Sequence, residues 1–98
     1  MIITSHILDS ELHRQSSAIV SQYLAWCYEI KHEHWTDGSD ILEHYPKAEL
    51  CSSNKVIFHI LKGKAIIYTH VEYSLKRVFV RFVGPVEDFE KNIKRTVA

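Results

Sequence analysis

Hydrophobic and polar residues alternate along residues 54–83, and this pattern predicts three consecutive antiparallel strands. Residues 65–73 form a run rich in β-branched and aromatic side chains, with short turn segments before it at Lys62-Gly63 and after it at 74–76. A two-residue period bounded by turn residues is typical of β-hairpins. The first strand alternates between two sets of side chains, Val56, Phe58 and Ile60 in one and Lys55, Ile57 and His59 in the other.

Helical spacing dominates the first third of the chain. Between residues 17 and 35, apolar side chains recur every three or four positions, which predicts an amphipathic helix that packs on the sheet through Tyr23 and Trp26. Residues 1–3 are expected to form a strand at the sheet edge. Thr4 or Ser5 would then cap a first helix, whose buried side is predicted to consist of Ile7, Leu8 and Leu12.

Shorter elements complete the pattern. Ser39 or Asp40 is expected to cap a short helix that ends at Tyr45-Pro46, because the residue before proline avoids helical geometry. Residues 47–53 are expected to be a loop. Pro85 suits the start of a final helix, with an apolar stripe of Val86, Phe89, Ile93 and Val97. The sequence therefore predicts one α+β domain over residues 1–98, an antiparallel sheet with helices packed on one face in the order β-α-α-β-β-β-α.

Composition narrows the class of protein. Hydrophobic residues make up 46% of the 98 residues and charged residues 24%, which is typical of a folded globular protein and excludes a disordered chain. No apolar run is long enough to span a membrane, and the N-terminus lacks the features of a signal peptide. Cys27 and Cys51 are too few for a disulfide framework and lack metal-binding spacing. We therefore expect a cytoplasmic protein without a metal or cofactor.

The net charge of zero conceals an uneven distribution. Residues 1–53 hold eight acidic residues and three basic ones, whereas residues 54–83 hold one acid, Glu72, and six basic residues. A basic sheet favours a polyanionic partner. The alternative is that strands exclude acidic residues and that lysines protect strand edges from aggregation. The six basic residues are Lys55, Lys62, Lys64, Lys76, Arg77 and Arg81.

The candidate chemistry lies on the predicted sheet, because no local catalytic motif is present. Phe79 falls between Arg77 and Arg81, and cations interleaved with rings suit phosphates and unpaired RNA bases. Cleavage of RNA without a metal needs an acid and a base near the ribose 2′-hydroxyl and cations around the phosphate. His59 or His70 would supply the acid or base, because imidazole titrates near neutrality. Each histidine also fits a surface or strand-packing role.

A series of short motifs extends from the end of the long helix to the last strand. Val78 to Gly84 has the form Val-Phe-Val-Arg-Phe-Val-Gly, and the earlier motifs keep a fixed order and spacing before it. Together they resemble the HigB-type toxins of the RelE superfamily, which belong to bacterial type II toxin–antitoxin modules. The earlier matches are Trp35, Asp40-Ile41, Tyr45-Pro46, Ala48, Ile57-Phe58-His59-Ile60, Lys62-Gly63-Lys64 and Tyr73.

The resemblance implies a small RelE-like fold and an endoribonuclease that inhibits translation by cleaving mRNA, either free or on the ribosome. It also implies neutralisation by a helix-turn-helix antitoxin. The acid/base chemistry would act at the ribose 2′-hydroxyl. The expected catalytic residues are His59, His70, Arg81 and Glu90, and the expected RNA-binding residues are Lys55, Lys64, Arg77, Phe79, Arg81 and Phe89.

Three positions depart from the family pattern. Val86 and Phe89 stand where these toxins carry His and Tyr in a C-terminal signature, and Ile66 stands where they carry Arg. Losing an acid/base group and a phosphate clamp typically costs orders of magnitude in rate. Three hypotheses therefore stand. The chain is an active endoribonuclease toxin, a RelE-like domain that binds an antitoxin or repressor without cleaving RNA, or an unrelated α+β domain that forms a homodimer.

Overall fold

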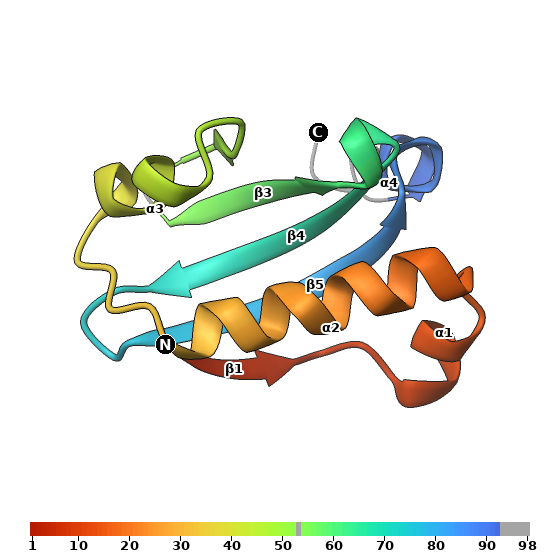
Figure 1. The fold of residues 1–98 in the computed structure, drawn as a ribbon, viewed down its shortest axis with the longest axis horizontal. Helices are drawn as coiled ribbons and strands as arrows, with labels where there is room; N and C mark the ends of the chain where they lie inside the picture. The colour runs from red at the N-terminus through yellow and green to blue at the C-terminus, as the bar shows by residue number, and fades with distance from the viewer. Residues whose placement is uncertain (53, 93–98) are drawn as a thin grey trace.

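In a computed structural model, which describes residues 1–52 and 54–92, five strands form one mixed sheet in the order β1-β5-β4-β3-β2 (Figure 1). The three predicted hairpin strands are confirmed, because β3, β4 and β5 pair antiparallel in sequence order. The prediction of a wholly antiparallel sheet is wrong, because the edge strand β1 pairs in parallel with β5. The strands are β1 (Ile2–Ser5), β2 (Glu49–Leu50), β3 (Lys55–Ile60), β4 (Ala65–Glu72) and β5 (Arg77–Pro85).

Helices lie on both faces of this sheet, and together they confirm the α+β class and agree with a RelE-like fold. In the described part of the chain, no helix is long and apolar enough to cross a membrane. Ile93 and Val97, predicted for the stripe of the last helix, lie outside the described residues. The helical elements are α1 (Asp9–His13), α2 (Ser17–Lys31), α3 (Gly38–His44), the 3-10 turn η1 (Leu61–Gly63) and α4 (Val86–Asn92).

The main hydrophobic core lies between α2 and one face of the sheet, which we call the helix face (Figure 1). Trp26 is 3% exposed, and its ring centroid lies 5.2 Å from that of Phe58 on β3. Tyr23 stacks on Trp26 at 6.0 Å. The predicted packing of α2 through these two rings is therefore confirmed. Large buried rings contribute much of the hydrophobic stabilisation of a domain of this size.

One helix departs from the predicted one-sided arrangement. α4 packs on the opposite face of the sheet, which we call the far face, where Phe89 lies 5.3 Å from Tyr68 and 5.6 Å from Phe82 between ring centroids. The apolar stripe of α4 requires burial, but it fits either face of a sheet. Because β5 leads directly into α4, the last strand determines where this helix starts.

A β-bulge in β5 sets Arg81 apart from the regular pairing. Tyr68 pairs with Phe82 and Thr69 with Val80, so no residue of β4 stands opposite Arg81. The bulge also reverses the alternation of the strand. Phe82 consequently lies on the far face, whereas an unbroken two-residue alternation would place it on the helix face with Val80.

Several local predictions at element ends are corrected by the structure. Thr4 and Ser5 belong to β1 and cap no helix, and Leu8 is 64% exposed instead of buried. Asp37 caps α3, because its carboxylate accepts hydrogen bonds from the backbone N–H groups of residues 39 and 40. The segment expected to be a loop, 47–53, contains the two-residue strand β2.

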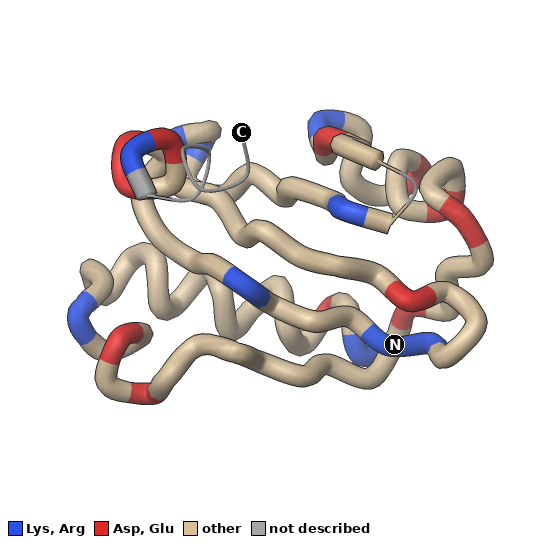
Figure 2. The backbone as a smooth tube through the Cα atoms, turned by 180° about the vertical axis from the view of Figure 1, so that it is seen from behind, with Lys and Arg blue, Asp and Glu red and all other residues tan. Residues whose placement is uncertain are grey.

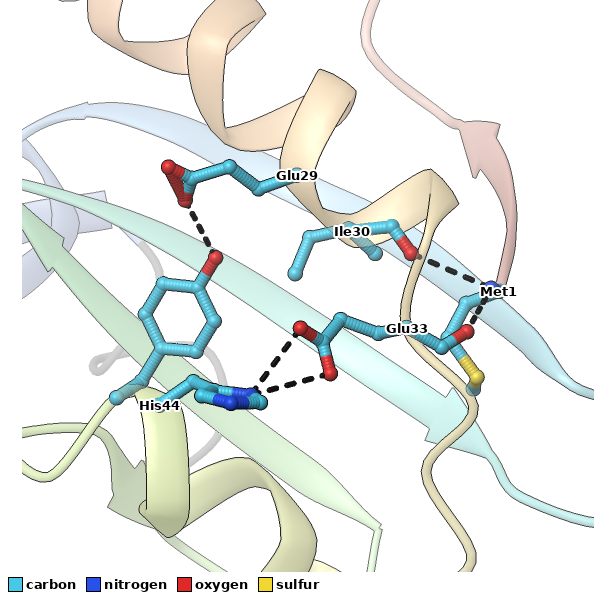
Figure 3. Close-up of polar contacts among 6 residues, drawn as sticks. Met1, Glu29, Ile30, Glu33 and His44 are labelled. Atoms are coloured by element: carbon cyan, nitrogen blue, oxygen red, sulfur yellow. Dashed lines mark hydrogen bonds and ion pairs between the residues drawn. The ribbon is translucent and has the colours of Figure 1, made fainter.

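Polar contacts fasten the C-terminal end of α2 to α3 and to the N-terminus (Figure 3). The Tyr45 hydroxyl donates to the Glu29 carboxylate at 2.6 Å, and His44 Nδ1 lies 3.1 Å from Glu33 Oε1. The terminal ammonium group of Met1 donates to backbone carbonyls at the same helix end. Burial and the hydrogen bond to Glu29 raise the pKa of Tyr45, which keeps its hydroxyl protonated as a donor. These contacts position residues 44–48 beside the sheet.

Candidate functional site

The far face of the sheet divides into two halves of opposite character. Figure 2 shows the molecule from this side, with basic positions on the strands in blue. We call the half beneath α4, together with the α4 side chains that pack on it, the covered half. It consists of Ile57, Ile66, Tyr68 and Phe82 on the strands and Val86 and Phe89 on α4. The half that α4 leaves free, called the open half, consists of Lys55, His70, Glu72, Arg77 and Phe79.

His70 is the centre of the open half. Its Nε2 lies 2.8 Å from Glu72 Oε1 and 3.0 Å from Asn54 Nδ2, and its side chain is 23% exposed. When Nε2 carries a proton it donates to Glu72, and when Nε2 is unprotonated it accepts from Asn54. Both protonation states of this nitrogen therefore have a partner. Both of these contacts use Nε2, and no hydrogen bond between described residues uses Nδ1.

An aromatic row lies next to His70. The Phe79 ring is half-buried, with its centroid 6.2 Å from the His70 ring and 5.7 Å from the His6 ring, which stacks on it. His6 is exposed. Rings arranged in this way offer flat surfaces on which unpaired bases can stack.

Cations surround the same half of the sheet. Lys55 stands directly opposite His70 in the pairing of β3 with β4, and Arg77 stands opposite Glu72. Arg77 is held in place by a hydrogen bond from its guanidinium to the Thr4 hydroxyl at 2.7 Å. Arg81 is exposed at the bulge, and within the described chain neither it nor Lys55 forms an ion pair. These groups are available to phosphate oxygens.

The structure separates the two predicted histidines. His59 and Lys55 are four residues apart on β3, and Lys55 pairs with His70, so the histidines lie about 13 Å apart along the strands. They cannot act as acid and base on the same phosphate. His59 has its own acidic neighbour, because its Nε2 lies 2.7 Å from Glu49 Oε2.

The remaining predicted site residues lie at the α4 end. Lys64 is exposed, and its carbonyl accepts a hydrogen bond from the Val86 N–H at 3.1 Å. Glu90 is exposed on α4. Phe89, expected to bind RNA, is only 8% exposed because its ring packs in the covered half. A base could stack on Phe89 only after α4 had moved.

The three departures from the HigB pattern come together in space. Ile66, Val86 and Phe89 are all members of the covered half, and Ile66 is 2% exposed. The positions where the resemblance places arginine, histidine and tyrosine thus form a small hydrophobic core. These three side chains therefore supply no acid/base or phosphate-binding group.

Sequence reasoning missed the partners of both histidines. Glu72 follows His70 by two positions on a strand, so the two-residue period could have placed both on one face. Glu49 and Asn54 gave no such signal, because they meet the histidines from neighbouring segments. Among residues 1–52 and 54–92, no group of three or more His, Cys, Asp and Glu side chains is arranged to hold a metal ion.

Comparison with known proteins identifies a family. The model of the HigB toxin family, described as the RelE-like toxic component of a toxin–antitoxin system, matches residues 20–92. No curated protein matches the chain in sequence. The family match covers most of the domain and overturns the hypothesis that the chain is unrelated to these toxins.

Proposed function

The chain belongs to the HigB family of RelE-like toxins, the toxic components of toxin–antitoxin systems, and we propose that it is an endoribonuclease that cleaves mRNA. One observation carries the proposal. His70, with Glu72 and Asn54 at its Nε2, lies beside the Phe79 ring and opposite Lys55 on the open half. An acid/base group, a stacking surface and cations are what RNA cleavage without a metal requires.

In the proposed reaction, His70 acts first as a general base. Its Nδ1 takes the proton of a ribose 2′-hydroxyl, and the 2′-oxygen forms a bond to the adjacent phosphorus. The bond from phosphorus to the 5′-oxygen breaks, which leaves a 2′,3′-cyclic phosphate and a 5′-hydroxyl after the leaving oxygen takes up a proton from water or from the imidazolium. Glu72 stabilises the imidazolium through Nε2–H. Lys55 and Arg81 would stabilise the charge on the phosphate.

The setting of this activity follows from the family. We propose that the substrate is mRNA, free or on a bacterial ribosome in the cytoplasm, and that cleavage stops translation. A helix-turn-helix antitoxin would hold the toxin inactive. Phe79 would stack on a base next to the cleaved bond, while Arg77, fixed by Thr4, would bind a flanking phosphate.

A second function is favoured by the covered half. Ile66, Val86 and Phe89 replace polar family positions with a packed apolar cluster. A chain that had lost cleavage would keep a fold stabilised in this way while still binding an antitoxin. In this alternative, the domain binds its partner without cutting RNA.

Inducible expression in a bacterial host separates the two functions. Growth and total protein synthesis would be followed for the wild type, for His70→Asn and Arg81→Ala, and for His13→Asn as a control on the exposed part of α1. The endoribonuclease proposal predicts arrest by the wild type and the control, with relief by the first two substitutions. Unimpaired growth with soluble, folded wild-type protein would contradict it and support the binding function.

A further inference from the structure

A groove of about 740 Å³ lies at the β3 edge of the sheet, away from the open half. One wall is the last residue of α3 and the segment after it, from His44 to Ala48, and the other is the turn at Lys62 and Gly63. The β3 residues Phe58 and His59 line it between these walls. The contacts of Tyr45 with Glu29 and of His44 with Glu33 hold the first wall against α2 (Figure 3).

On its outer side, away from β4, β3 has no paired strand among the described residues where it lines the groove. β2 pairs only with Val56 and Ile57, and continuing that register would place Lys47 opposite His59. Instead the chain turns away, because the Ala48 N–H donates to the Tyr45 carbonyl. Lys55 directs its carbonyl toward the β2 side, where it accepts from the Cys51 N–H.

Strand geometry then fixes the direction of the His59 backbone. Every second residue of a strand directs its N–H and C=O groups to the same side. His59, four residues after Lys55, therefore directs both groups into the groove. An open sheet edge of this kind is a template for one more strand.

The side chains of the groove indicate the chemistry of its occupant. Tyr45 and Ala48 supply apolar surface above the buried Phe58 ring, and Lys47 and Lys62 supply positive charge. The carboxylate of Glu49 lies 2.7 Å from His59 Nε2, which partly neutralises the acid beside the groove. A backbone donor and acceptor next to apolar surface suit a peptide strand, whereas a phosphate backbone has no N–H groups to pair with the His59 carbonyl.

We propose that an extended segment of the antitoxin binds in this groove as an added strand on β3, with an acidic side chain against Lys47 and Lys62. The family requires an antitoxin, so the proposal rests on family membership and not on the ribonuclease activity. The bound strand would hydrogen-bond to His59 and extend the sheet along the outer side of β3, next to this groove. It would leave the His70 side of the far face uncovered.

Amide hydrogen exchange on the wild-type toxin tests this directly. The exchange of the His59 amide would be measured by NMR in the free toxin and in the complex with the antitoxin of the same module. We expect it to slow at least tenfold in the complex, with the exposed turn residue Ser74 unchanged. An unchanged His59 amide would overturn the proposal. Slowing by a single-stranded 12-nucleotide RNA but not by the antitoxin would overturn it in favour of an RNA site.

Paired substitutions separate the backbone from the side chain. His59→Pro removes the outward N–H, which an edge strand tolerates, whereas His59→Ala removes only the side chain. The antitoxin should bind His59→Pro at least tenfold more weakly than the wild type and His59→Ala within threefold. Lys62→Glu should weaken binding about fivefold, and Lys91→Glu on exposed α4 should not. Equal antitoxin binding by the proline and alanine variants would contradict strand addition. The RNA cleavage rates of all four variants would be measured as well, which tests the proposed ribonuclease activity separately from antitoxin binding.

Discussion

The covered and open halves of the far face occupy the same sheet but use it differently. Beneath α4, Ile66 and Phe89 are 2% and 8% exposed and form part of a second small core. A few residues along the same strands, His70 and Lys55 stand opposite each other with their side chains only partly buried. Packed apolar side chains stabilise the fold, whereas partly exposed polar pairs contribute little stability. The covered half is thus a structural cluster, and the proposed chemistry would use the other half of the same face.

This division explains how the chain can depart at three positions from the pattern that the resemblance implies and still fold as a family member. Each apolar residue in the covered half contributes roughly 1.5–3 kcal/mol when fully buried. The cluster therefore fixes α4 on the sheet more firmly than polar residues would. Four substitutions test the division, from the largest expected effect to the smallest.

Ile66→Arg restores the charge that the family pattern has at this position, but it places that charge in a packed apolar cluster. We expect the free energy of unfolding to fall by about 4 kcal/mol, because a buried charge without a partner is strongly destabilising. Urea denaturation of the purified protein measures the change, and Ile66→Val, expected to cost about 1 kcal/mol, is the control. A stable arginine variant with increased RNA cleavage would show that the covered half can still act as a catalytic site.

Phe89→Ala removes the ring that anchors α4. We expect a loss of about 3 kcal/mol in unfolding free energy, at the low end for a buried phenylalanine, because the site lies near the molecular surface. Phe89→Leu should cost less than about 1.5 kcal/mol. Both variants should bind RNA as the wild type does under folding conditions. Weaker RNA binding by the stably folded leucine variant would contradict the assignment of Phe89 to stability alone.

Phe79→Ala removes the ring beside His70. If one base stacks on Phe79, RNA affinity should fall by about 1–3 kcal/mol. Fluorescence anisotropy with a single-stranded RNA would measure this, with Leu75→Ala in the exposed turn as the control. Unchanged affinity would place the RNA elsewhere on the molecule.

Lys55→Ala should have the smallest effect, since it removes one phosphate contact. The slope of the logarithm of RNA affinity against the logarithm of salt concentration should fall by about one unit. Lys91→Ala on α4 should leave the slope unchanged. Identical slopes for both variants and the wild type would remove Lys55 from the RNA site.

The sequence was sufficient to predict the elements with long regular patterns of hydrophobic residues. It was insufficient to predict the structure where such a pattern is short or interrupted. The stripe on α2 predicted that Trp26 packs on the sheet, and the structure places its ring against Phe58 of β3. β2 has two residues, too few to show a period, and the bulge at Arg81 reverses an alternation that sequence alone continues. The stripe of α4 shows that the helix is buried but not on which face of the sheet.

The candidate site shows the same limit in its chemistry. The basic residues and His70 could be found from their strand positions, because side chains two apart share a face. Glu49 beside His59 and Asn54 beside His70 depend on how separate segments meet. The distance between the histidines also came only from the register of β3 with β4.

Cleavage of a defined mRNA by purified protein tests the role of the open half most directly. The wild type, His70→Asn and His59→Asn would be compared in the presence of a chelator. Removing the acid/base group should lower the rate of the His70 variant by about 10²–10⁴-fold, while the His59 variant should stay within about threefold of the wild type. The reverse order would show that the catalytic histidine lies at the α4 end, and no cleavage by the wild type would leave partner binding as the function of the domain.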